Sequence, residues 1–167
     1  PRCIECWFKV NRLPRREACV FSVARDESRV LLRPDGRVEL RLKKPHGIPD
    51  PKRTSEAALA LIEAKKAEIV SPEPIRPSEW VHVAIYNKPH PTPGGGEPWD
   101  ARLKVNGTDV AFYLSERFNH YHHFMGRRET EIVLANAKAG DAPFAGVIDE
   151  FRVSSKHRGH YERPPLP

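Results

Sequence analysis

Apolar residues recur at every second position in short stretches of this chain, and this period constrains its fold more than any other feature. In residues 4–10, apolar Ile4, Cys6, Phe8 and Val10 alternate with Glu5, Trp7 and Lys9. Residues 38–43 repeat the pattern, with Val38, Leu40 and Leu42 on one side. A period of two is that of a β-strand with one buried face. The sequence therefore predicts half-buried antiparallel strands.

Turn residues separate these stretches at close intervals. Pro34-Asp35-Gly36 lies between residues 30–32 and 38–40 and predicts a turn between two strands. Asn106-Gly107 is the preferred pair for a type I′ hairpin turn, because both central residues need a positive φ. Many short strands with such turns indicate an all-β fold, either an antiparallel β-sandwich or a jelly roll.

Three segments depart from the strand pattern. Residues 54–66 are rich in strong helix formers, with Thr54 or Ser55 as N-cap, so we expect one short inserted helix within about residues 51–66. Residues 89–98 have no periodicity and predict a long Pro- and Gly-rich loop. The proline-rich residues 161–167 cannot continue a sheet and are interpreted as a linker or tail.

Length and composition favour a single domain. The chain has 167 residues, of which 30% are charged and 39% hydrophobic, and no apolar run approaches the length of a membrane span. No signal peptide is recognisable. Because the chain starts at Pro1 and opens directly on a strand, we expect it to be a piece of a longer precursor.

The net charge of +6 permits an acidic partner. However, the basic pairs Arg15-Arg16, Lys43-Lys44, Lys65-Lys66 and Arg127-Arg128 are spread along the chain with acidic residues between them. A generally solvated surface is therefore the favoured interpretation, and no nucleic-acid partner is expected.

Three cysteines leave the redox state open. Cys3 and Cys6 have a C-x-x-C spacing, but Trp7 stands where a haem-binding motif requires His, and on a strand the two side chains face opposite ways. Cys6 and Cys19 are expected on neighbouring antiparallel strands. Either a Cys6–Cys19 disulfide in an oxidising compartment or buried free thiols would fit.

Four motifs in series resemble a known family. Residues 79–86 (EWVHVAIY) contain a W-x-H-V-A strand, residues 103–107 (LKVNG) an L-x-V-N-G hairpin, and residues 144–155 (FAGVIDEFRVSS) a closing F-x-G-x-I-D-E strand, with a short I-x-L-A strand before it. Residues 4–10 (IECWFKV) are similar to an early F-T-I-E-A-W strand. Together they resemble the laminin G-like branch of the concanavalin A-like jelly rolls, although the strand that usually precedes F-T-I-E-A-W is absent.

The resemblance implies one laminin G-like jelly-roll β-sandwich over residues 1–160 and a non-catalytic recognition module. Such a module would bind a glycan or a protein ligand within a larger secreted, periplasmic or cell-surface protein. The alternative is a structural domain that packs against other domains or subunits. Burial or exposure of Trp7 and Tyr86 would discriminate between the two.

A ligand-binding patch is predicted on the face that carries Trp7, His82 and Tyr86. His82 and Tyr86 lie on the face of their strand opposite Val81 and Val83, and Trp7 lies opposite the apolar side of its own strand. Aromatic rings stack on sugars while polar neighbours hydrogen-bond the hydroxyls. The alternative is that the inserted helix or the long loop covers this face.

Two groups could bind metal. Asp149 and Glu150 match the I-D-E of the family, in which a calcium ion is often held near the closing strand, so calcium is an expectation for these carboxylates. The alternative is that one of them forms an ion pair with Arg152 or with a lysine near the N-terminus and fixes the closing strand. His120, His122 and His123 form the densest group of imidazoles, but their spacing matches no recognised zinc or copper site, and an exposed loop is favoured.

No catalytic site is predicted. Glycanases of this fold place carboxylates at alternate positions of one strand, as in E-x-D-x-E. Glu129 and Glu131 come nearest, with Val133 at the third position. We therefore expect the domain not to be an enzyme.

Overall fold

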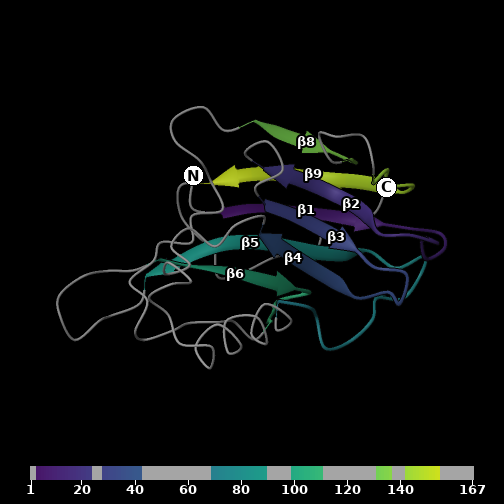
Figure 1. Cartoon of the computed structure of the whole chain (residues 1–167), viewed down its shortest axis with the longest axis horizontal. Coiled ribbons are helices and arrows are strands. Elements are labelled where there is room, and N and C mark those ends of the chain that lie inside the picture. The colour runs from purple at the N-terminus through teal and green to yellow at the C-terminus, as the bar shows by residue number, and fades with distance from the viewer. Residues whose placement is uncertain are drawn as a thin grey trace, which may run out of the picture.

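The structure is a computed structural model that describes residues 3–23, 28–42, 69–89, 99–110, 131–136 and 142–154. In this part of the chain nine strands form two antiparallel sheets that lie one over the other (Figure 1). Their bounds are β1 (Cys3–Lys9), β2 (Ala18–Val23), β3 (Ser28–Leu32), β4 (Val38–Leu42), β5 (Val81–Pro89), β6 (Trp99–Val105), β7 (Thr108–Asp109), β8 (Ile132–Leu134) and β9 (Val147–Ser154). The all-β sandwich expected from the alternation is confirmed.

Strand order differs from sequence order in both sheets. The five-stranded sheet has the order β7-β6-β5-β1-β9, and the four-stranded sheet has the order β4-β3-β2-β8. The early strand β1 thus lies between the late strands β5 and β9, and every pairing is antiparallel. The last described strand is therefore paired with the first.

Several expectations fall outside the described residues. They are the inserted helix at 51–66, most of the loop at 89–98, the His120 to His123 cluster and the tail at 161–167. The described residues themselves contain no helix, and among them no segment could span a membrane as a helix.

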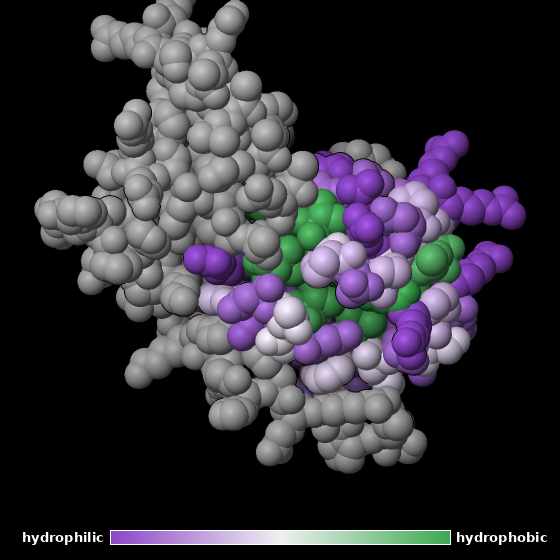
Figure 2. Space-filling view, turned by 90° about the horizontal axis from the view of Figure 1, so that it is seen from below, coloured by the Kyte–Doolittle hydropathy of each residue, from purple (hydrophilic) through white to green (hydrophobic). Residues whose placement is uncertain are grey.

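The core lies between the two sheets. Alternate residues of β1, namely Ile4, Cys6 and Phe8, point inward and are fully buried, as the sequence period predicts. Phe21 of β2 comes from the opposite sheet and meets Phe151 of β9 edge to face, with ring centroids 5.7 Å apart. Figure 2 views the molecule from below and shows hydrophobic residues framed by hydrophilic ones.

Both predicted turns are confirmed. Gly36 has φ 83° between β3 and β4, where its N–H donates to the Arg33 carbonyl at 3.0 Å. Asn106 and Gly107 have φ values of 48° and 82° and join β6 to β7. These positive φ values are those that a type I′ turn demands of its two central residues.

The prediction that Cys6 and Cys19 lie on neighbouring antiparallel strands is wrong. Cys6 lies on β1 of the five-stranded sheet and faces the core, whereas Cys19 lies on β2 of the four-stranded sheet and belongs to a separate cluster with Leu31 and Ala142. The β1–β2 connection crosses between the sheets instead of forming a hairpin. All three cysteines are buried free thiols. Burial and the adjacent Glu5 carboxylate raise the pKa of the Cys6 thiol far above its usual range, so it is a poor nucleophile.

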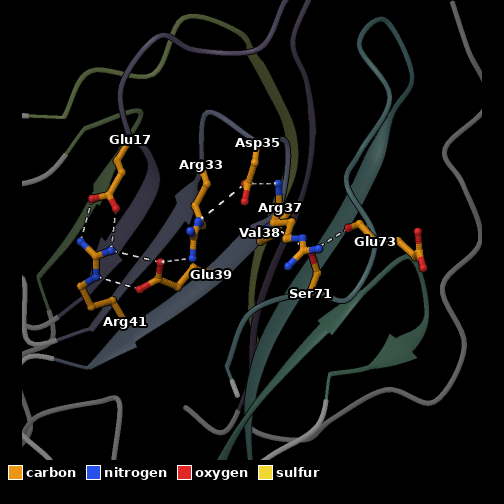
Figure 3. A network of polar contacts seen from close by, with 9 residues as sticks. All are labelled: Glu17, Arg33, Asp35, Arg37, Val38, Glu39, Arg41, Ser71 and Glu73. Carbon is orange, nitrogen blue, oxygen red and sulfur yellow. Dashed lines mark hydrogen bonds and ion pairs between the residues drawn. The ribbon is translucent and has the colours of Figure 1, made fainter. Parts of the chain in front are cut away.

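A chain of ion pairs covers the outer side of the four-stranded sheet (Figure 3). The Arg41 guanidinium donates two hydrogen bonds of 2.7 Å to the Glu17 carboxylate and also bonds Glu39 at 2.8 Å. Arg33 lies 3.8 Å from Glu39 and 3.6 Å from Asp35. The bond from Arg41 holds the pKa of Glu17 below its usual range. Bidentate contacts of this kind fix the direction of Glu17.

The close approach at Gly146 gives a testable constraint on the start of β9. A Cβ atom there would lie 2.5 Å from the Lys9 carbonyl oxygen and 2.6 Å from the Phe144 ring. We predict that Gly146→Ala lowers the free energy of unfolding by about 1–3 kcal/mol, because backbone and ring must both shift. Chemical denaturation measures this change.

Gly107→Ala is the matched control, since no atom lies within 4 Å of the added Cβ and only the positive φ is penalised. We expect it to cost about 1 kcal/mol. A smaller loss in Gly146→Ala than in Gly107→Ala would contradict the packing described for Gly146.

Candidate functional site

The outer face of the five-stranded sheet brings the predicted patch together. Trp7 of β1 pairs with His82 of β5, and their rings have centroids 5.1 Å apart. Tyr86 lies farther along β5, opposite Cys3. The three side chains named from the sequence therefore share one face of one sheet, although Tyr86 is four residue pairs beyond the Trp7–His82 contact.

This face is buried instead of open. His82 is 2% exposed, Tyr86 5% and Glu5 4%, whereas Trp7 is half-buried. A stacking platform for sugars requires exposed ring faces. The ligand-binding role of Trp7, His82 and Tyr86 stays a prediction, and by the criterion set from the sequence the burial of Tyr86 favours a packed face.

Charged groups accompany the buried rings. The Tyr86 hydroxyl donates a 2.5 Å hydrogen bond to Asp109 Oδ1, and the Lys104 ammonium lies 5.7 Å from the centre of the Tyr86 ring and 3.8 Å from the same carboxylate. His82 Nε2 lies 3.7 Å from Glu5 Oε2. Burial, followed by the bond to Asp109, raises the pKa of Tyr86 well above its usual range. The face thus combines buried rings with polar contacts that end at the exposed carboxylate of Asp109.

His82 remains neutral in this network. Burial, with smaller contributions from Lys104 and Arg152, lowers the pKa of His82 from 6.5 to about 4, even though the Glu5 carboxylate is close. Its charged form is therefore disfavoured in the folded state over the range in which an unfolded histidine titrates.

The pKa of His82 predicts a pH dependence of stability. Below about pH 6.5 the unfolded chain takes up a proton that the folded chain resists until about pH 4, so the free energy of unfolding should fall as the pH decreases through this window. Denaturation curves recorded at several pH values measure this decrease. We expect the free energy of unfolding of His82→Gln to decrease less than that of the unchanged protein when the pH is lowered through this window. An NMR titration that gives His82 an ordinary pKa in the native protein would disprove this.

Asp149 and Glu150 lie at an irregularity of β9. The pairing with β1 shifts between Glu5 and Trp7, and Glu150 has φ 51°, which marks a β-bulge. Asp149 Oδ1 accepts a 2.7 Å bond from the Glu150 N–H, and the Glu150 carboxylate forms an ion pair with Arg152. A bulge interrupts the regular alternation of a strand, so two neighbouring side chains no longer have to point to opposite faces of the sheet.

Calcium at these residues stays a prediction. The ion takes six to eight oxygen ligands. Within the described ranges no group of three or more acidic, His or Cys side chains gathers, and Glu150 is already held by Arg152. The contacts present therefore fit an ion pair better than a metal site.

A thermal shift assay distinguishes the two. From the contacts of Glu150 we expect calcium to change the melting temperature no more than sodium or magnesium at matched ionic strength. An ion bound only by the folded state would instead raise the melting temperature through mass action. A rise specific to calcium, reversed by chelator and absent in Asp149→Asn, would establish a calcium site.

A groove not anticipated from the sequence lies at one end of the sandwich. It has a volume of about 710 Å³ and runs between the β1–β2 connection, residues 10–17, and residues 143–145 before β9. Its apolar lining comprises Val10, Leu13, Ala18, Leu32 and Phe144. Phe144 is anchored by an edge-to-face contact with Phe8, at 5.7 Å between ring centroids.

The rim of the groove is cationic. Arg12, Arg15 and Arg16 line it and are exposed, and Glu17 is its sole acidic lining residue among the described ones. Because Glu17 is bound by Arg41, its charge is already compensated. The sequence signal for this rim is the R-x-x-R-R spacing of Arg12, Arg15 and Arg16 between two strands, which is not apparent when Arg15-Arg16 is taken as one of several dispersed basic pairs.

The described residues thus define an antiparallel β-sandwich of two sheets with a groove at one end. The comparison with known families agrees. A laminin G family model, described as the concanavalin A-like lectin/glucanases superfamily, matches residues 2–162, and the chain belongs to this family. Its laminin G-like domains are generally non-enzymatic binding domains. No curated protein and no solved structure matches the chain significantly.

Proposed function

We propose that this chain is a non-catalytic recognition module that binds a glycan or a protein ligand in the groove beside the β1–β2 connection. The proposal places the module in a larger secreted, periplasmic or cell-surface protein, as laminin G-like membership suggests. The observation that carries it is a concave surface with an apolar floor and an arginine rim. Ligand sites of proteins combine these two features, an apolar pocket and a few polar groups that fix orientation.

The walls of the groove support this role because they are held in place without a ligand. The Val10 carbonyl accepts a 2.7 Å bond from Ser78 N–H, and Phe144 N–H donates to the Ala135 carbonyl at 3.0 Å. Both walls are therefore tied to the sandwich. A preformed site binds at a smaller entropic cost than one that must order on binding.

A second candidate, a structural domain that packs against other subunits, is favoured by a different observation. Val147 and Val153 of the edge strand β9 are 52% and 47% exposed, and Leu134 of the edge strand β8 is 45% exposed. Exposed apolar side chains on edge strands are suited to contact with another polypeptide.

Binding surveys with matched variants test the first candidate. We predict that a ligand found in a survey of glycans and peptides loses at least roughly tenfold in affinity, about 1.4 kcal/mol, when Arg12, Arg15 and Arg16 are all replaced by Ser. Arg76→Ser is the control, because Arg76 is exposed and does not line the groove. Its affinity should equal that of the unchanged protein.

Other outcomes point elsewhere. Loss of binding in Trp7→Ala with retention in the triple arginine variant would place the site on the outer sheet face. A concentration-dependent dimer in sedimentation, abolished by Val153→Thr, together with no ligand bound by the groove, would support the assembly role instead.

A further inference from the structure

We propose that the groove recognises an acidic peptide segment that inserts an apolar side chain between its walls. This inference rests on the proposed function and specifies its ligand. The groove combines two features that a single polypeptide ligand would satisfy together: an apolar floor, and a rim of three exposed arginines that form no ion pair with another described residue.

The floor calls for an apolar anchor. Val10 is 3% exposed, Leu32 is fully buried and Phe144 is 8% exposed, while Leu13 on the wall is half-buried. Leu13 also packs against the β3–β4 turn, because its Cδ1 lies 3.4 Å from the point that a Cβ atom on Gly36 would occupy. An aliphatic or aromatic side chain placed here would itself leave water and would cover the apolar surface that half-buried Leu13 and exposed Pro143 and Ala145 still present.

The same floor suits a sugar poorly. Sugar recognition uses Trp or Tyr faces for stacking, and it uses side chains such as Asn or Asp that both position and accept hydroxyl hydrogen bonds. The lining contains neither Trp nor Tyr, and its polar side chains are three arginines and Glu17. Arginine only donates hydrogen bonds, so this rim is matched to acceptors that carry negative charge.

The charge balance of the rim selects an acidic ligand. Within the described ranges no ion pair is formed by Arg12, Arg15 or Arg16, whereas the nearby Glu17 is neutralised by two 2.7 Å bonds from Arg41 (Figure 3). Guanidinium groups bind carboxylates in a bidentate manner. A segment with Asp or Glu on either side of an apolar residue would therefore place carboxylates at the rim while its anchor occupies the floor.

Fluorescence anisotropy with synthetic peptides tests the inference. The probe is a short acetylated peptide in which acidic residues flank a Leu-Phe pair, and two controls replace either Leu-Phe by Gly-Ser or the acidic residues by Gln. We expect only the complete peptide to bind tightly, with each control weakened at least about tenfold and with affinity that falls as salt is added. Amide shifts should be confined to residues 10–18 and 143–146.

Variants separate the two features of the groove. Arg15→Glu should weaken the complete peptide at least about tenfold and reduce the salt dependence. Leu13→Ser should weaken it several-fold and leave the salt dependence unchanged, since the charged rim is intact. Arg76→Glu should leave binding almost unchanged, and circular dichroism with melting curves should show that all three variants are folded.

The remaining outcomes count against the inference in distinguishable ways. If a sulfated oligosaccharide or single-stranded DNA shifts the same groove amides and the peptide does not, the groove is a recognition site and the peptide inference fails. Equal binding of the Gly-Ser control would refute the apolar anchor. If a ligand is found whose binding ignores Arg15→Glu and Leu13→Ser, both the inference and the groove as the site of recognition fail.

Discussion

The double pairing of β1 is the constraint on which the rest of the structure depends. β1 pairs with β5 along one edge and with β9 along the other, so one strand near the start of the chain brings together two segments distant in sequence. Its inward residues Ile4, Cys6 and Phe8 are fully buried against the opposite sheet. Because β1 is hydrogen-bonded on both sides, the position of its last residue, Lys9, is fixed. The point at which residues 10–17 leave the sheet to form one wall of the groove is therefore fixed as well.

The groove follows from that placement. β1 ends at Lys9, and the chain must cross to the other sheet to begin β2 at Ala18. This crossing forms one wall, and the segment before β9 forms the other because β9 is the neighbour of β1. Phe144 packs on Phe8, and Gly146 is the residue that allows this close approach. The cationic rim and the core are thus consequences of the same strand order.

Much of the fold could be predicted from local patterns. The alternation of residues 4–10 identified β1 and its faces, and Asn106-Gly107 identified a turn whose two positive φ values the structure contains. The motif strands also placed Trp7 and His82 on one face, where they contact each other. Burial of that face was not predictable from alternation, because the period of two says which side chains share a face and nothing about what covers it.

The sequence by itself determined the strands, their faces and the family, because each depends on residues close together in the chain. Only the tertiary structure decided that Cys6 and Cys19 lie on different sheets, that a bulge forms at Glu150, and that Arg12, Arg15 and Arg16 rim a groove closed by Phe144. These features depend on which distant segments pair and pack. Local propensity does not specify that pairing, because the pairing is set by the free energy of burying the whole core at once.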